Sequence, residues 1–127
     1  MALGAEMLNH FLDAFREFPD RGDASQARAR AAVESVLAAA RQTQTYLTAA
    51  RGRAGADDRV AELDLIDLWH DAALHLERVD VDLSQICLTS AQFWSHPRNW
   101  SPEEFDAVLH TAREVCDEAR QRLEESG

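Results

Sequence analysis

The chain has 127 residues, of which 46% are hydrophobic and 28% are charged, and its net charge is −10. That length is typical of one domain with one core, and the composition excludes a disordered or collagen-like chain. No cluster of positive residues offers the charge that direct binding to nucleic-acid phosphates requires, and no apolar run is long enough to span a membrane. We therefore expect residues 1–127 to form a single soluble domain.

Helix signals recur along the first half of the chain, whereas the alternation typical of strands is absent. Apolar residues at three- and four-residue steps predict a first helix over about residues 3–18, which Pro19 to Gly22 ends. Asp23 and Gln26 form a capping box for a second, alanine-rich helix that stops before Gly52. The apolar stripe of this second helix includes Val33, Val36, Ala40, Thr43 and Leu47.

Three further helices are predicted after residue 56. Asp57 or Asp58 opens the third helix, and the pair Asp82 and Gln85 is a capping box for a short helix over residues 82–95. Ser101 as N-cap, with Pro102 at the first helical position and Glu104 three residues on, starts the last helix. The inward stripe of the third helix contains Leu65, Trp69, Ala72, Ala73 and Leu76, and that of the last contains Phe105, Val108, Leu109, Ala112, Cys116, Ala119 and Leu123.

Short connections between helices favour antiparallel neighbours. The sequence therefore predicts an all-α fold, an antiparallel bundle of about five helices. We expect a core like that of a four-helix bundle, in which the short helix and the 96–101 turn make one corner. The two cysteines, Cys87 and Cys116, fall on apolar helix faces, so we expect buried free thiols.

Charge is uneven along the chain. Residues 1–56 carry seven arginines and six acids, a net charge of +1, whereas residues 57–127 carry six arginines and seventeen acids, a net charge of −11. Asp64, Asp67 and Asp71 lie on the side of the third helix opposite its apolar stripe. Such a row is either a solvated face that maintains solubility or a docking surface for a basic partner.

The segment from Phe93 to Trp100 holds two of the three tryptophans in the chain. Tryptophan and arginine are enriched in interface hot spots, so Trp94, His96, Arg98 and Trp100 are candidate partner-binding residues. The alternative is a structural plug that closes the end of the bundle, with Trp94 or Trp100 stacked over Trp69. The two interpretations are compatible if one ring is buried and the other is exposed.

Histidines and carboxylates on helices raise the alternative of a metal-dependent helical-bundle enzyme. The nearest approach to a ligand set is Asp67 and His70, one turn apart, together with Asp106, His110 and Glu114 at four-residue steps. Neither group reproduces the Glu-x-x-His pairs of di-metal bundles. His70 and His75 are too far apart around the helix to bind one metal ion. We therefore expect no cofactor and no catalytic residue.

Phosphate-binding glycine loops and nucleophile-elbow motifs are absent from the sequence. The remaining interpretation is a non-catalytic protein–protein interaction module, such as an adaptor, an inhibitor, an immunity-type protein or an accessory subunit of a defence or signalling system. All 13 basic residues are arginine, which is typical of a GC-rich bacterial genome, and no secretory signal is recognisable, so we expect a bacterial cytoplasmic protein. The predicted partner is a protein with a basic surface rather than nucleic acid or a membrane.

A homodimer is a further expectation from the third helix. Leu63, Ile66 and Leu74 flank His70 at helical spacing, which gives this helix more apolar circumference than one core face requires. If the chain is instead a monomer, His70 is expected to be a partly buried core histidine.

Overall fold

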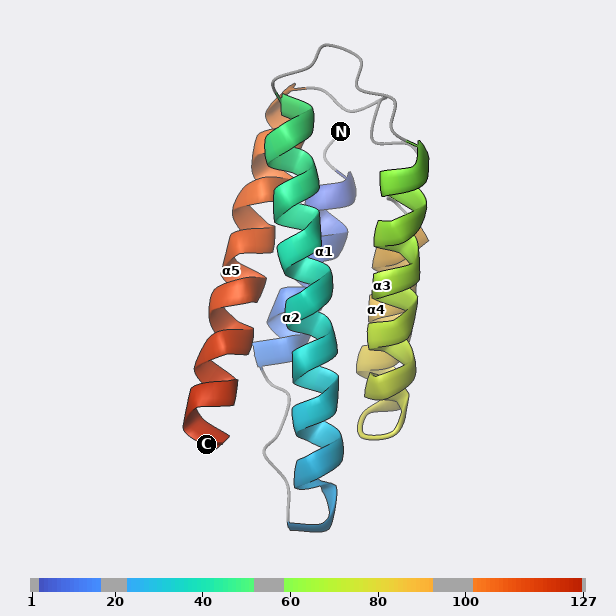
Figure 1. Cartoon of the computed structure of the whole chain (residues 1–127), viewed down its shortest axis with the longest axis vertical. Coiled ribbons are helices and arrows are strands. Elements are labelled where there is room, and N and C mark those ends of the chain that lie inside the picture. The colour runs from blue at the N-terminus through green and yellow to red at the C-terminus, as the bar shows by residue number, and fades with distance from the viewer. Residues whose placement is uncertain (1–2, 17–22, 52–58, 93–101, 127) are drawn as a thin grey trace.

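The structure, a computed structural model, describes residues 3–16, 23–51, 59–92 and 102–126. These residues form the helices α1 (Leu3–Arg16), α2 (Asp23–Arg51), α3 (Arg59–Glu77), α4 (Val81–Gln92) and α5 (Pro102–Ser126), with no strand in the described ranges (Figure 1). The predicted all-α bundle is therefore confirmed. Within the same ranges, no helix combines the length and the apolar character that crossing a bilayer demands.

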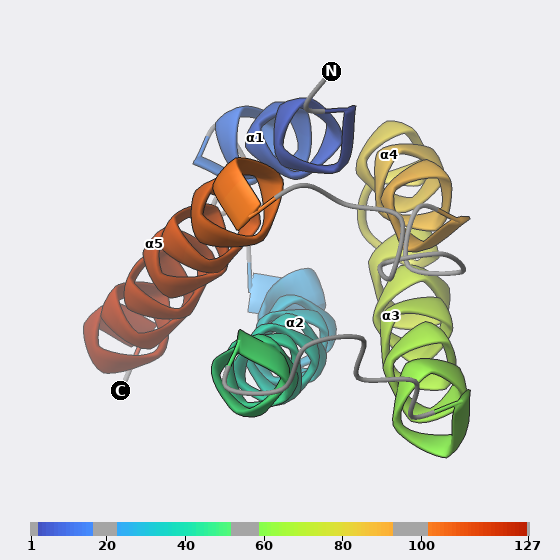
Figure 2. The same cartoon turned by 90° about the horizontal axis from the view of Figure 1, so that it is seen from above.

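The five helices pack as a ring in the order α1, α5, α2, α3, α4 and back to α1 (Figure 2). Successive helices in the chain alternate in direction, so the pairs α2–α5, α2–α3, α3–α4 and α1–α4 are antiparallel (Figure 1). A ring with an odd number of alternating helices has to contain one parallel pair. That pair is α1 and α5, which both run away from the N-terminal end of the bundle.

The core is centred on Trp69 of α3, whose side chain is fully buried. Its ring meets that of Phe11 from α1 edge-on, with the centroids 5.7 Å apart. Its indole Nε1–H donates to Thr43 Oγ1 on α2 at 3.0 Å, and that hydroxyl donates to the Ala39 carbonyl at 2.8 Å. The one polar group of the ring therefore has its partner inside the core, as burial requires.

The apolar stripes predicted from the sequence face this core. Every predicted stripe position whose side chain the structure describes is buried or half-buried, and both cysteines are buried free thiols as expected. Burial raises the pKa of Cys87 to about 12. The last helix begins at Pro102 as predicted, whereas Ser101 and the 96–101 turn lie outside the described residues.

The connection between α3 and α4 corrects one detail of the sequence analysis. Asp80, not Asp82, caps α4: its Oδ1 accepts from the Leu83 N–H at 3.1 Å, and its carbonyl accepts from the Ser84 N–H at 3.0 Å. This is the geometry of an N-cap residue, whose side chain satisfies the third backbone N–H of the helix. The predicted start at Asp82 is wrong because the helix already includes Val81.

Two further hydrogen bonds join α4 to α3. The Ser84 hydroxyl donates to the Ala73 carbonyl at 2.7 Å, and the Cys87 thiol donates to the Trp69 carbonyl at 3.4 Å. Both donors are buried and both acceptors belong to the inward side of α3. This hairpin fixes the orientation of α3, so its opposite side is presented to solvent.

Candidate functional site

The outward side of α3 carries the three aspartates that the sequence analysis selected. Asp64, Asp67 and Asp71 are all exposed, and Trp69 on the same helix is fully buried. The side chain of Asp71 is 61% exposed and lies 3.7 Å from His75 Nε2, one turn further along. The carboxylates therefore form a row along solvent rather than a buried acidic cluster.

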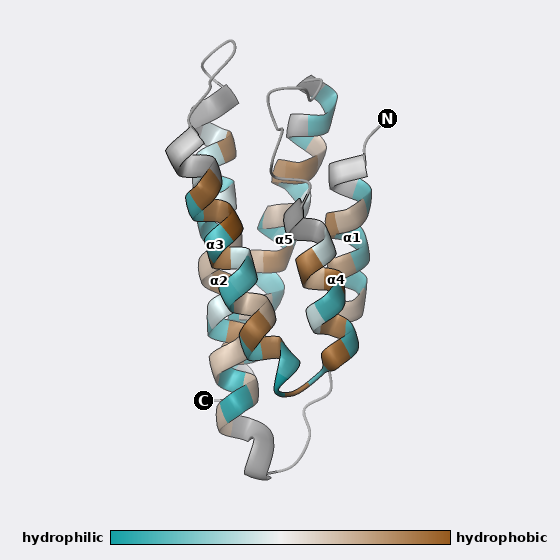
Figure 3. Cartoon of the chain, turned by 90° about the vertical axis from the view of Figure 1, so that its right-hand side faces the viewer, coloured by the Kyte–Doolittle hydropathy of each residue, from teal (hydrophilic) through white to brown (hydrophobic). Residues whose placement is uncertain are grey.

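Two leucines lie within this acidic row. Leu63 is 45% exposed and Leu74 is 63% exposed, which makes them two of the three large hydrophobic residues exposed among the described residues. They are about three helical turns apart, or roughly 16 Å, and point to nearly the same side of the helix. Figure 3 shows hydrophobic and hydrophilic residues alternating along α3 on the face turned to the viewer.

Toward its C-terminal end, the outward side of α3 is hollowed. An open depression of about 600 Å³ is lined by Asp71, Leu74, His75, Glu77 and Arg78. It places an apolar side chain between acidic ones, with one histidine and one arginine at its edge. We define the acidic–leucine face as Leu63, Asp64, Asp67, Asp71 and Leu74, and this depression adjoins it.

The apolar stripe that favoured a homodimer is only partly on the surface. Ile66 is half-buried and packs against the core, whereas Leu63 and Leu74 remain exposed. His70 is exposed, so its interpretation as a partly buried core histidine is wrong. The reason is that His70 lies beside the outward leucines and not on the side of α3 that carries Trp69.

The tryptophan-rich segment lies outside the described residues. The four candidate residues of this segment all fall within 93–101: Trp94, His96, Arg98 and Trp100. Both interpretations of the segment, a structural plug and a recognition site, therefore stay predictions.

The residues of the metal alternative are divided between two helices that are not neighbours in the ring. Asp67 and His70 lie on α3, whereas Asp106, His110 and Glu114 lie on α5, across the bundle in Figure 2. Across the described ranges, no group of three or more histidine, cysteine or acidic side chains is placed to hold a metal ion. The structure therefore does not bring this candidate ligand set together.

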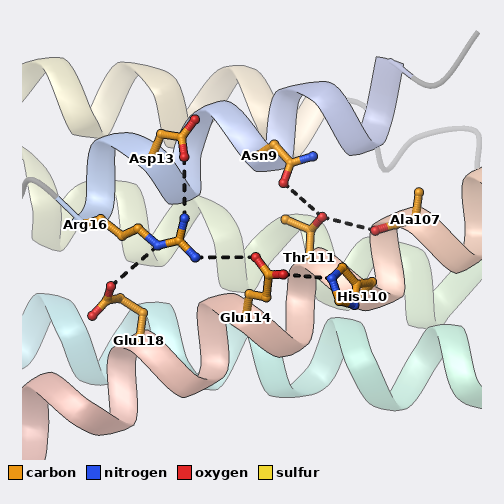
Figure 4. Close-up of polar contacts among 8 residues, drawn as sticks. All are labelled: Asn9, Asp13, Arg16, Ala107, His110, Thr111, Glu114 and Glu118. Carbon is orange, nitrogen blue, oxygen red and sulfur yellow. Dashed lines mark hydrogen bonds and ion pairs between the residues drawn. The ribbon is translucent and has the colours of Figure 1, made fainter.

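Glu114 instead belongs to an ionic seam between α1 and α5, which Figure 4 shows in detail. Glu114 Oε1 lies 2.7 Å from His110 Nε2, and its other oxygen lies 3.5 Å from Arg16 Nη2. Arg16 also approaches Asp13 at 3.6 Å and Glu118 at 3.7 Å. This seam is not predictable from the sequence because it depends on the parallel contact of α1 and α5, which no local pattern reveals.

A second surface missed from the sequence is a groove between α2 and α5. It is open to solvent, has a volume of about 520 Å³, and is lined by Arg41, Gln44, Thr45, Thr48 and Arg120. Each of these residues resembles an ordinary solvated helix residue when it is seen alone, so the sequence gives no signal for the group.

Known proteins offer no match. No family model, no curated protein and no solved structure is significantly similar to this chain. Among the surfaces formed by the described residues, the acidic–leucine face combines exposed apolar side chains with a row of three aspartates.

Proposed function

We propose that this protein is a non-catalytic interaction module that binds a basic segment of another protein through the acidic–leucine face of α3. The single observation that carries the proposal is the exposure of Leu63 and Leu74, at 45% and 63%, within a row of three exposed aspartates. Aspartates alone would be adequate for solubility. Two outward leucines among them add apolar area that a partner can cover.

The two kinds of side chain have different roles in such a complex. The aspartates attract a positively charged partner and orient it, which mainly raises the association rate. The leucines supply apolar area that is buried on contact, which mainly slows dissociation. A basic amphipathic helix with two apolar residues about 16 Å apart has the complementary pattern, because three turns of an α-helix span that distance.

Charge favours a different protein over a second copy of this chain. In a two-fold dimer through this face, Asp64, Asp67 and Asp71 of one copy would lie against the same residues of the other. Like charges placed together across an interface are unfavourable. A homodimer through α3 is therefore the weaker alternative, and it becomes an outcome of the experiment.

The proposed cellular role is that of a bacterial binding protein whose partner is basic. The absence of lysine beside 13 arginines supports a bacterial origin, and the charge of −11 on residues 57–127 supports a basic partner. Adaptor, inhibitor, immunity-type protein and accessory subunit all use a binding face of this kind without catalysis.

The experiment compares three variants of the full chain as baits in the native host, followed by surface plasmon resonance with the captured protein. One variant changes Asp64, Asp67 and Asp71 to Asn, and a second changes Leu63 and Leu74 to Ser. The control changes three exposed glutamates on other helices to Gln, which alters the net charge by the same amount: Glu6, Glu103 and Glu124.

We expect the asparagine variant to associate more slowly and with a weaker dependence on salt, because its long-range attraction is reduced. The serine variant is expected to dissociate at least roughly tenfold faster, as loss of a hot-spot contact predicts. The glutamine control should match the parent chain. A partner bound equally well by all variants, or a mass of two chains in light scattering that the serine variant lowers to one, would contradict the proposal.

A further inference from the structure

The groove between α2 and α5 is lined by hydrogen-bond donors. Its lining residues supply two guanidinium groups, two hydroxyls and one side-chain amide, and none of them is acidic. In a chain with a net charge of −10, a depression without a lining carboxylate and with two arginines from different helices is a local reversal of charge. The chemical complement of such a groove is an anion with several acceptor oxygens.

The two arginines are not equally engaged. Arg120 Nη1 approaches Asp117, one turn earlier on α5, at 3.7 Å, which is a long contact between two exposed side chains. Arg41 on α2 has no hydrogen bond or ion pair to any residue that the structure describes. At least one guanidinium in the groove therefore keeps all five of its donors for a ligand.

The side-chain amide of Gln44 contacts a buried cysteine of α5. The buried thiol of Cys116 donates to Gln44 Oε1, with sulfur and oxygen 3.7 Å apart. With its oxygen turned toward the thiol, the amide leaves its amino group as the part available to the groove. In this orientation, the amino group of Gln44 presents two donors to a ligand.

The thiol of Cys116 remains uncharged because it is buried. Burial raises the pKa of the Cys116 thiol, while the positive charges of Arg120 and Arg41 act in the opposite direction. The same two guanidinium groups therefore influence one sulfur atom, which agrees with their shared position on the groove wall. The thiol keeps its proton at neutral pH, so its hydrogen bond to Gln44 is retained.

We propose that this groove binds a small molecule through a phosphate group, held between Arg41 and Arg120. Guanidinium groups from two neighbouring helices match a tetrahedral oxyanion, since each presents paired donors to two of its oxygens. Thr45, Thr48 and the Gln44 amino group offer hydroxyl and amide donors to the remaining oxygens. A volume of about 520 Å³ is that of a site for a small molecule and not for a folded partner.

This site is distinct from the acidic–leucine face. The groove belongs to α2 and α5, whereas the proposed protein interface lies on the outward side of α3 (Figure 2). The two proposals can therefore fail or hold separately, because variants of one surface leave the residues of the other unchanged.

The test is a titration of the ¹⁵N-labelled full chain with inorganic phosphate, followed by NMR at constant ionic strength. Acetate, titrated in parallel, reports on a plain carboxylate. The variants are Arg41→Gln and Arg120→Gln, and the matched control is Arg30→Gln. Arg30 is also an exposed arginine of α2, paired with Glu34 at 3.2 Å, and lies roughly 16 Å along the helix from Arg41.

We expect saturable shifts of the Gln44 side-chain amide with phosphate, and weaker ones with acetate. Each groove variant should weaken phosphate binding at least roughly tenfold, because it removes charge-assisted hydrogen bonds. The Arg30→Gln control should bind as the parent does, and spectra of all variants away from the groove should be unchanged. Shifts that do not saturate, equal losses in the control, or acetate binding as tight as phosphate would each overturn the proposal.

Discussion

The Trp69 centre and the α1–α5 seam hold neighbouring helices together by opposite means. Around Trp69, the donors are buried and each bond has its acceptor inside the core, as with the indole and Thr43 at 3.0 Å. Along the seam, Arg16 is half-exposed and its three carboxylate contacts are 3.5–3.7 Å long. A buried donor loses its only partner when the acceptor is removed, whereas an exposed ion exchanges its partner for water.

The comparison indicates where the stability of the bundle resides. α1 contributes Leu8, Phe11, Leu12 and Phe15 to the core, all of them almost fully buried. Phe11 and Phe15 stack with centroids 5.7 Å apart, and Phe11 also meets Trp69. We infer that α1 is held in the bundle mainly by these rings. The ionic seam then determines the register of α1 against α5 more than it strengthens the packing of α1.

The largest expected effect is at the centre. Trp69→Ala should reduce the free energy of unfolding by about 3–5 kcal/mol, because it removes a large buried ring and leaves a cavity in the core. Urea denaturation followed by circular dichroism measures the change. Leu74→Ala is the matched control, since it lies on the outward side of the same helix and should change stability by less than about 0.5 kcal/mol.

A second pair of variants isolates the hydrogen bond within that effect. Thr43→Val keeps the shape of the side chain but leaves the indole N–H without its acceptor, at a cost of about 1–3 kcal/mol. Thr45→Val, two residues on and exposed, provides the comparison. If Thr43→Val were as harmless as Thr45→Val, the buried hydrogen bond would not matter and the contrast between the two regions would disappear.

An intermediate effect is expected from pH at the edge of the Trp69 centre. The pKa of Cys87 is about 12 in the folded chain and 9.0 when it is not perturbed, so the folded state retains the thiol proton where the unfolded state loses it. The unfolded state therefore binds fewer protons between these values, and stability falls as pH rises through that range. One thiol contributes a slope of up to about 1.4 kcal/mol per pH unit.

This slope is accessible because the chain has no lysine and one tyrosine, which leaves few groups that titrate between pH 9 and 11. Urea denaturation of the parent and of Cys87→Ala across that range compares the slopes and not the absolute stabilities. The variant is expected to lose stability less steeply. Parallel curves would show that Cys87 ionises with equal ease in both states.

The sequence predicted the parts of the fold that repeat locally. Phe11, Val36 and Trp69 each lie on stripes with helical period, and period alone identifies the buried side of a helix. The N-cap of α4 was placed two residues late, at Asp82, because Asp80 and Asp82 both suit a cap and only backbone geometry distinguishes them. The aspartates of α3 were placed on the solvent side by the same period.

The remaining features depend on which helices become neighbours. Arg41 and Arg120 line one groove only because α2 and α5 are adjacent, and Arg16 meets Glu118 only because an odd ring forces α1 and α5 to be parallel. Neither adjacency is encoded in a local pattern. The exposure of Leu63 and Leu74 is more nearly predictable, since the excess apolar circumference of α3 is visible in the sequence.

The smallest expected effect is on the seam. Arg16→Gln removes contacts to three carboxylates, but its side chain is 49% exposed and its guanidinium is hydrated in the unfolded chain, so the loss should be at most about 1 kcal/mol. The main chain at Arg16 is unaffected, and its carbonyl continues to accept from Arg122 Nη2 at 2.6 Å. Arg122 in turn lies over the Phe15 ring, 5.1 Å from its centroid, which keeps the two helices in contact without Arg16.

The measurement is urea denaturation of the parent and of Arg16→Gln at low and at high salt. Because exposed ion pairs are screened, the small difference between the two chains should shrink further as salt rises. A double-mutant cycle with Glu118→Gln gives the coupling of one pair alone, expected at about 0.2–1 kcal/mol. The contrary result is a loss of stability from Arg16→Gln that approaches the loss from Trp69→Ala and persists at high salt. The seam would then contribute as much to stability as the tryptophan centre, and the distinction between the two regions would not hold.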